Sequence, residues 1–222
     1  MVYSALFLGA ERATRSMEGK TIMSDTLGAL RRAGEGGRFD RLRRDDGKGA
    51  LDASAARSLE RDLKAALDGE VRFDKGTRAL YATDGSNYRQ APIGVVIPRH
   101  IQDAETAIAL ARKHRAPVLC RGGGTSLGGQ CCNVAVILDF SKYMHKVVEI
   151  DARARMGRVQ PGCVLDHFRE TAKKEAGLFF GPDPATHSRC TIGGMLGNNS
   201  CGSHSLLSKK HGLGVRMSDN TH

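Results

Sequence analysis

The ten residues from Arg121 to Gln130, RGGGTSLGGQ, constrain this chain more than any other segment, because five of them are glycine. Such a turn lets backbone N–H groups approach a bound group closely, and successive amides can form a concavity that suits an anion. The flanking apolar runs 116–120 and 134–138 predict buried strands. We therefore expect a loop that joins two core strands and holds a phosphate, with a tight turn that binds no ligand as the alternative.

The loop does not match two common nucleotide-binding motifs. Gly123 and Gly128 have the spacing of a P-loop, but Gly129 and Gln130 stand where the lysine and the hydroxyl residue are required. The dinucleotide fingerprint G-x-G-x-x-G fails because Leu127 occupies the position of its third glycine. We therefore expect neither ATP hydrolysis nor a Rossmann nucleotide site.

A second glycine-rich segment lies at 191–202 and follows the proline-rich residues 181–184. Three motifs, APIGVVIP at 91–98, RGGGTSLGGQ and PDPATHSRCTIGGMLGNNSCGS, together resemble the FAD-binding domain of the p-cresol methylhydroxylase and vanillyl-alcohol oxidase family. Within that family the chain looks most like the branch of glycolate oxidase large subunits, D-lactate dehydrogenases and D-2-hydroxyglutarate dehydrogenases. The resemblance runs from about Gly69 to the last residue. It implies an α+β fold, the two-subdomain FAD-binding fold of the p-cresol methylhydroxylase type, with an incomplete second subdomain.

The resemblance also implies a cofactor site. The first loop would cradle the FAD pyrophosphate, with hydroxyl donors from Thr125 and Ser126, and the second segment would lie along the flavin. Thr125 stands where some relatives carry a histidine bonded covalently to the flavin, so we expect noncovalent FAD. The candidate cofactor-binding residues are Arg121, Gly122, Gly123, Gly124, Thr125, Ser126, Leu127, Gly128, Gly129, Gln130, Pro182, Pro184, Thr191, Gly193, Gly194, Asn198, Asn199, Ser200 and Gly202.

The function implied by the resemblance is that of an FAD-dependent dehydrogenase or oxidase acting on a D-2-hydroxy acid of the D-lactate, glycolate or D-2-hydroxyglutarate type. The catalytic residues and the contacts to this small-molecule substrate are expected in a cap domain beyond residue 222, and the electron acceptor is unknown. Two alternatives stay open. The first is a noncatalytic, truncated FAD-binding module, and the second is an aryl-alcohol or sugar oxidase of the same superfamily.

Three regions are predicted along the chain. Residues 1–50 are expected to be a disordered or mis-started extension and linker, with Met23 as the functional start and a mitochondrial presequence as a minor alternative. Residues 51–90 are expected to form a helical region that docks on the flavin domain, beginning with an amphipathic helix at 52–67. Residues 91–222 are expected to form the FAD-binding domain.

Hydrophobic patterns predict the elements on either side of the loop. A strand at 95–97 precedes a helix, which leads to the strand before the loop; the strands of such a unit are expected to be parallel. The apolar runs 134–140, 146–150 and 158–162 suit a meander, and a helix is predicted at 164–176. The apolar stripe of the first helix consists of Ile101, Ala104, Ile108 and Ala111, and that of the second of Leu165, Phe168 and Ala172.

Charge and cysteine content exclude several other classes of function. The net charge is +10, but much of the basic excess lies near the N-terminus and around 209–211, and aromatic residues make up only 5%, so no nucleic-acid partner is expected. The six cysteines contain no C-x-x-C pair, so no metal site is expected, and reduced thiols indicate a cytoplasmic location. No apolar run is long enough to span a membrane, although a peripheral location at the inner membrane is an alternative.

Overall fold

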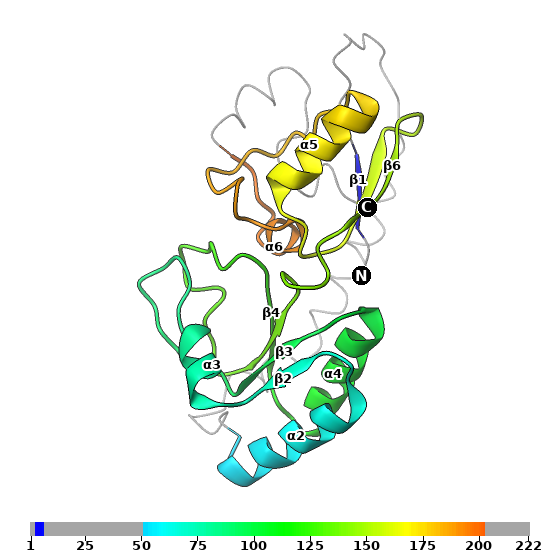
Figure 1. Ribbon diagram of the computed structural model, residues 1–222. Coiled ribbons are helices and arrows are strands. Elements are labelled where there is room, and N and C mark those ends of the chain that lie inside the picture. The colour runs from blue at the N-terminus through cyan, green and yellow to red at the C-terminus, as the bar shows by residue number, and fades with distance from the viewer. Residues whose placement is uncertain (1–2, 7–50, 203–222) are drawn as a thin grey trace, which may run out of the picture. The chain divides into compact units, whose positions relative to one another are not determined.

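Figure 1 shows the computed structural model, in which residues 3–6 and 51–202 are described. The described strands form one sheet of order β2–β3–β5–β4 and another of order β1–β7–β6. Helices accompany both sheets, and the mixed α+β class that the sequence predicts is confirmed. Among the described residues, no helix combines the length and the apolar character needed to cross a bilayer.

Of the elements in the described residues, seven make up the first sheet and its helices, and five make up the second sheet and its helices. The first group comprises α2 (Ala53–Ala66), β2 (Glu70–Arg72), α3 (Lys75–Leu80), β3 (Gly94–Ile97), α4 (Ile101–Lys113), β4 (Val118–Arg121) and β5 (Val136–Asp139). The second group comprises β1 (Tyr3–Leu6), β6 (Val147–Asp151), β7 (Met156–Val159), α5 (Leu165–Ala176) and α6 (Ile192–Gly197).

Helix α2 forms where the amphipathic pattern predicts it. The carboxylate of Asp52 accepts hydrogen bonds from the backbone N–H groups of Ser54 and Ala55, which caps the helix N-terminus. Leu59 and Leu63 lie four residues apart and are fully buried, so one face of α2 packs on the core. The expectation of a helix at 52–67 is thus confirmed to within a residue at each end.

Strand β5 lies between β3 and β4 and pairs with both in the parallel sense. The two strands that α4 connects are therefore parallel, as expected, but they are not neighbours. Both faces of the sheet are covered: Val96 and Leu138 pack with α2 and α4, whereas Val95 and Ile137 face the opposite side. Burial on both faces is typical of parallel strands, and it explains why β3 and residues 136–138 of β5 carry no polar side chain.

The buried face of α4 differs in one position from the predicted stripe. Ala104 and Ala111 are buried as expected, but Ala107 is buried in place of Ile108, which is 40% exposed. The buried apolar residues of α4 are therefore all alanines, whose small side chains allow α4 to lie close to α2 and to the sheet.

The second sheet is antiparallel and carries its own core. Strands β6 and β7 form a hairpin, and α5 packs on β6 (Figure 1). Leu165, Phe168 and Ala172 are buried, which confirms the predicted face of α5. The ring of Phe168 meets that of Phe180 edge to face, with 5.3 Å between centroids. The helix ends at Gly177, which has the left-handed conformation common at helix C-termini.

One expectation about the strands is wrong. The meander fails at its first strand, because β5 belongs to the parallel sheet, where its two buried faces find partners, and only β6 and β7 are antiparallel neighbours. Tyr3–Leu6 forms β1 on the edge of β7, whose open backbone groups accept a further strand, and the rest of the region 1–50 stays a prediction. Met23 and the linker lie outside the described residues.

Candidate functional site

A cavity of about 550 Å³ lies between the glycine-rich loop that follows β4 and the segment 184–200. Residues 119–127 form one wall, and Pro184–Thr186 together with most residues between Cys190 and Ser200 form the other. This volume is in the usual range for small-molecule sites. The two glycine-rich segments that the sequence singles out therefore enclose one space.

The two walls touch each other at Gly122 and Gly123. A Cβ atom on Gly122 would lie 1.9 Å from the Oγ1 atom of Thr191, and one on Gly123 would lie 2.3 Å from the carbonyl oxygen of Arg189. Neither distance is possible for a side chain, so glycine is required here for the close approach of the second segment. This role is additional to the close approach of a phosphate that the sequence suggests.

The loop contains a row of backbone N–H groups that have no acceptor in the described part of the chain. Within residues 51–202, no atom accepts a hydrogen bond from the backbone N–H of any residue from Gly122 to Leu127. Gly124 has a φ of 65°, which turns the backbone within this row. All six residues also line the cavity.

Arg121 holds the loop to its surroundings through backbone carbonyl groups. Its Nη2 donates to the carbonyl of Thr83 at 2.9 Å, and its Nη1 donates weakly to those of Tyr81 and Cys131 at 3.4 and 3.3 Å. The guanidinium carbon lies 5.2 Å from the centre of the Tyr81 ring. Arg121 lines the cavity, as the sequence suggests for a cofactor ligand, but its polar atoms are directed at the protein in this structure.

Tyr81 is itself fixed at the carboxyl end of β5. Its hydroxyl donates to the carboxylate of Asp139 at 2.5 Å, and the second oxygen of Asp139 accepts from the backbone N–H of Ser141. Burial and the hydrogen bond to Asp139 raise the pKa of Tyr81. The phenol therefore stays protonated at neutral pH and serves as a fixed donor beneath Arg121.

A further segment, Asp84–Ser86, braces the loop from outside. The Asp84 carboxylate accepts from the backbone N–H groups of Ser86 and Cys131, and the N–H of Gly85 donates to the carbonyl of Gly124 at 2.9 Å. Ser126 is buried, with its Oγ 3.2 Å from the Sγ of Cys131. The hydroxyl predicted as a phosphate donor is thus engaged with a thiol.

The second wall is built around the start of α6. Thr191 is buried, and its hydroxyl accepts from the backbone N–H of Gly194 at 3.3 Å. The N–H of Ile192 donates to the carbonyl of Cys163, and that of Gly193 donates to the carbonyl of Pro161. These bonds tie the wall to the loop that precedes α5 and leave Asn198 and Ser200 at the cavity.

Most of the candidate residues line the cavity, and several others line it as well. The candidates at the cavity are Arg121, Gly122, Gly123, Gly124, Thr125, Ser126, Leu127, Gln130, Pro184, Thr191, Gly193, Gly194, Asn198 and Ser200. Gly128, Gly129, Pro182, Asn199 and Gly202 flank it without lining it. Leu119, Cys120, Cys131, Phe140, Pro161, Ala185, Thr186, Cys190, Met195 and Gly197 line it without being candidates.

Some of the additional lining residues could have been predicted from the sequence, and others could not. Ala185 and Met195 fall inside the motif that carries the resemblance, so including whole motifs would have found them. Phe140 and Pro161 come to the cavity only through the fold. Burial raises the pKa of Cys190, so this thiol contributes a neutral side chain to the wall.

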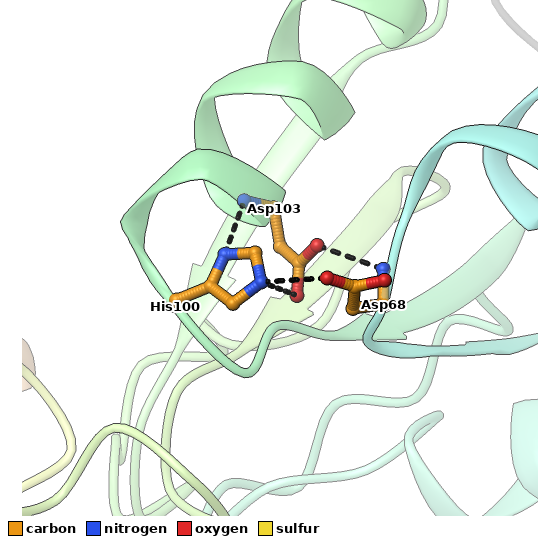
Figure 2. A group of neighbouring side chains, drawn as sticks. All are labelled: Asp68, His100 and Asp103. Carbon is orange, nitrogen blue, oxygen red and sulfur yellow. Dashed lines mark hydrogen bonds and ion pairs between the residues drawn. The ribbon is translucent and has the colours of Figure 1, made fainter.

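Asp68, His100 and Asp103 lie close together where the turn after α2 meets the start of α4 (Figure 2). Asp103 is buried, and its two oxygens accept from the backbone N–H groups of Asp68 and Arg99 at 3.0 and 2.9 Å. The Nδ1 of His100 accepts from the N–H of Asp103, so a neutral ring carries its proton on Nε2, which faces the Asp68 carboxylate at 3.1 Å. That nitrogen has no lone pair for a cation, and the group serves as a helix cap.

His187 also forms a local pair. Its Nδ1 lies 2.8 Å from the carboxylate of Asp166 at the start of α5, and the side chain is half exposed. It does not line the cavity, whereas its neighbour Thr186 does. His204 and His211, which the sequence also places near this segment, lie outside the described residues.

Comparison with known proteins identifies the domain. Residues 92–221 match the FAD binding domain family. The chain is 34% identical over 147 residues to D-2-hydroxyglutarate dehydrogenase from Pseudomonas putida, covering 65% of this chain and 14% of that protein. It is 33% identical over 156 residues to glycolate oxidase subunit GlcD from Bacillus subtilis, covering 67% of this chain and 33% of that protein. The chain thus spans a minor part of the relatives it matches.

Solved structures show the same fold. An alkyldihydroxyacetonephosphate synthase aligns with a TM-score of 0.61 and 25% identity over 70% of this chain and 34% of that chain. A p-cresol methylhydroxylase with bound substrate aligns with a TM-score of 0.61 and 18% identity over 69% of this chain and 31% of that chain. The expected fold type is confirmed for the aligned part.

Proposed function

Because the chain belongs to the FAD binding domain family, we propose that its cavity holds FAD noncovalently, with the pyrophosphate at the loop 122–130 and the flavin along the segment 191–202. The division of the chain belongs to the same proposal: residues 91–222 form the FAD-binding domain, and the region 51–90 docks on it. We assign no catalytic residue within the described part.

The row of N–H groups from Gly122 to Leu127, which have no acceptor among residues 51–202, carries this proposal. A pyrophosphate presents several oxygens that accept hydrogen bonds, and a concave row of amides can satisfy them without a lysine. Thr125 adds a hydroxyl at the cavity. Hydrogen bonds made by the side chains of Arg121 and Asp84 also hold the loop, so these amides are fixed in place before a ligand binds.

The second wall supports a flavin by shape and by a few polar groups. Pro184, Met195 and the backbone at Gly193 and Gly194 give an apolar and closely approachable surface, and Asn198 adds an amide. When bound, FAD would supply the capacity to accept a hydride equivalent and pass its electrons onward. The residues of this chain would bind and orient it and exclude water from one side.

We further propose that the enzyme to which this domain contributes oxidises a D-2-hydroxy acid. The support is the names of the relatives, D-2-hydroxyglutarate dehydrogenase and glycolate oxidase subunit GlcD. The substrate would be small, and the electron acceptor is not assigned. A cytoplasmic location, with a peripheral place at the inner membrane as the alternative, is in keeping with the six cysteines, all of which are free thiols.

Titration of the purified full chain with FAD tests the cofactor assignment. We expect FAD fluorescence to be quenched on binding, and acid precipitation to release the flavin into the supernatant. Thr125→Val removes the hydroxyl at nearly constant shape and should weaken FAD binding by roughly tenfold, whereas Thr125→Ser should restore it. A chain that takes up no FAD, or one that retains it covalently after acid, would contradict the proposal.

The substrate class is tested by adding D-lactate, glycolate and D-2-hydroxyglutarate, without oxygen, to the FAD-loaded enzyme to which this domain contributes. Bleaching of the flavin absorbance by one of these acids is the expected result. Bleaching only by an aryl alcohol or a sugar would move the assignment to another substrate class. FAD uptake without bleaching by any of these compounds would indicate a noncatalytic module.

A further inference from the structure

The part of the second wall that enters the cavity at Pro184 has no regular secondary structure of its own. Residues 177–190 connect α5 to the segment before α6 without a helix or a strand. Pro182 and Pro184 lack backbone N–H groups, so this stretch cannot form a full ladder of hydrogen bonds with a neighbouring strand. Its carbonyl groups need donors from elsewhere if residues 184–186 are to stay in place.

Arg169 of α5 supplies those donors. Its Nη2 donates to the carbonyl of Pro182 at 2.8 Å, and its Nε donates to that of Phe180 at 3.3 Å. Its Nη1 donates to the carboxylate of Asp183 at 2.8 Å. All three nitrogens of one guanidinium therefore bind three residues of the same short stretch.

The guanidinium also packs on the ring of Phe179, with 5.0 Å between its carbon and the ring centre. The Arg169 side chain is only 15% exposed, so these contacts are shielded from water. A planar group that binds two carbonyls and a carboxylate at fixed angles positions a chain more narrowly than a flexible ammonium can.

We propose that Arg169 is a positioning residue for the cofactor: it holds residues 179–183 so that Pro184, Ala185 and Thr186 form the flavin side of the cavity. The inference rests on the proposed function and adds a residue that lies outside both glycine-rich segments. Arg169 acts through the backbone of the second wall and does not itself line the cavity.

This role of Arg169 predicts different effects on the binding of two ligands that both contain a pyrophosphate, FAD and ADP. ADP carries the pyrophosphate without the flavin, so it depends on the amides of the loop 122–127. FAD needs both walls. Displacing the second wall should therefore weaken FAD binding and leave ADP binding nearly unchanged, whereas a general loss of folded protein would weaken both alike.

The experiment compares FAD and ADP affinities of the full chain and of its Arg169→Lys variant by titration, with circular dichroism to monitor folding. Arg158→Lys is the matched control, because Arg158 is an exposed arginine of β7 that pairs only loosely with Glu149 at 3.5 Å. We expect Arg169→Lys to weaken FAD binding roughly tenfold to a hundredfold. We also expect an altered visible spectrum of its bound FAD, an unchanged ADP affinity, and no change in Arg158→Lys.

Asp183→Asn provides a milder second variant, since it keeps an oxygen for Nη1 and removes the charge; it should shift FAD binding in the same direction by a smaller factor. A folded Arg169→Lys variant that binds FAD as the parent does, or that loses FAD and ADP in equal proportion, overturns this inference alone. A parent chain that binds no FAD refutes the proposed function and this inference with it.

Discussion

The contact between Gly122 and Thr191 predicts that Gly122→Ala destabilises the folded chain even when no ligand is present. The added Cβ would lie 1.9 Å from the Oγ1 atom of Thr191, whereas an ordinary contact between such atoms is about 3.4 Å. The two walls would have to separate by about 1.5 Å, or Thr191 would have to rotate and withdraw its oxygen from the N–H of Gly194.

The size of the effect follows from these two responses. Overpacking a tight contact costs about 1–3 kcal/mol, and loss of the helix cap costs about 1 kcal/mol. Replacing a glycine by alanine returns about 0.5–1 kcal/mol through the unfolded chain. We therefore expect the free energy of unfolding to fall by about 2 kcal/mol for Gly122→Ala.

Urea unfolding of the ligand-free chain measures this quantity, and a double-mutant cycle identifies its cause. Thr191→Ala removes the colliding oxygen and leaves a Cβ at 3.1 Å, so Gly122→Ala should be much less harmful in that background, with a coupling of about 2 kcal/mol. Gly197→Ala is the control, because a Cβ there meets nothing within 4 Å, and it should stabilise α6 slightly. Additive losses from Gly122→Ala and Thr191→Ala would refute the steric argument.

Two further predictions concern the first sheet. Hydrogen bonds, the largest from the Lys142 ammonium, lower the pKa of Glu70 to about 2 from 4.5, so its contribution to stability is complete above pH 4.5 and is lost as the pH falls towards 2. Glu70→Gln should therefore flatten the dependence of the urea midpoint on pH in that window, and an unchanged slope would contradict this. Asp103→Asn should lower the free energy of unfolding by about 1–3 kcal/mol, because the amide nitrogen would face a backbone N–H. Thermal unfolding measures this loss of stability, and Asp68→Asn, at an exposed position, is the control that should change stability little. An equal loss of stability in both variants would contradict the prediction.

The elements closest to the cavity could be predicted from sequence because local signals agree there. Continuous apolar runs on either side of the glycines predict the strands β4 and β5. The stripe of Leu165, Phe168 and Ala172 predicts α5, and the two glycine-rich segments indicate the two walls. In each case, residues near one another in the chain carry the whole signal.

Other features depend on contacts between distant residues and could not be predicted in this way. The donors of Arg121 reach carbonyls at 81, 83 and 131, so its part in bracing the loop appears only in the folded chain. Ile108 and Ala107 both fit a buried helical face by their spacing. Packing of α4 against α2 and the sheet buries Ala107 and leaves Ile108 exposed. Gly122 suggests a phosphate when considered alone, whereas the structure shows Thr191 against it.

The place of β5 between β3 and β4 has a consequence for how the chain folds. Both of its neighbours precede it in the sequence and do not pair with each other, so the parallel pairing of this sheet cannot form until Val136–Asp139 has been synthesised. A nascent chain that ends before residue 136 would hold β3 and β4 as two apolar strands without their shared partner. The antiparallel pair of β2 and β3 can form earlier, but the parallel part of the sheet must await the strand that follows the glycine-rich loop.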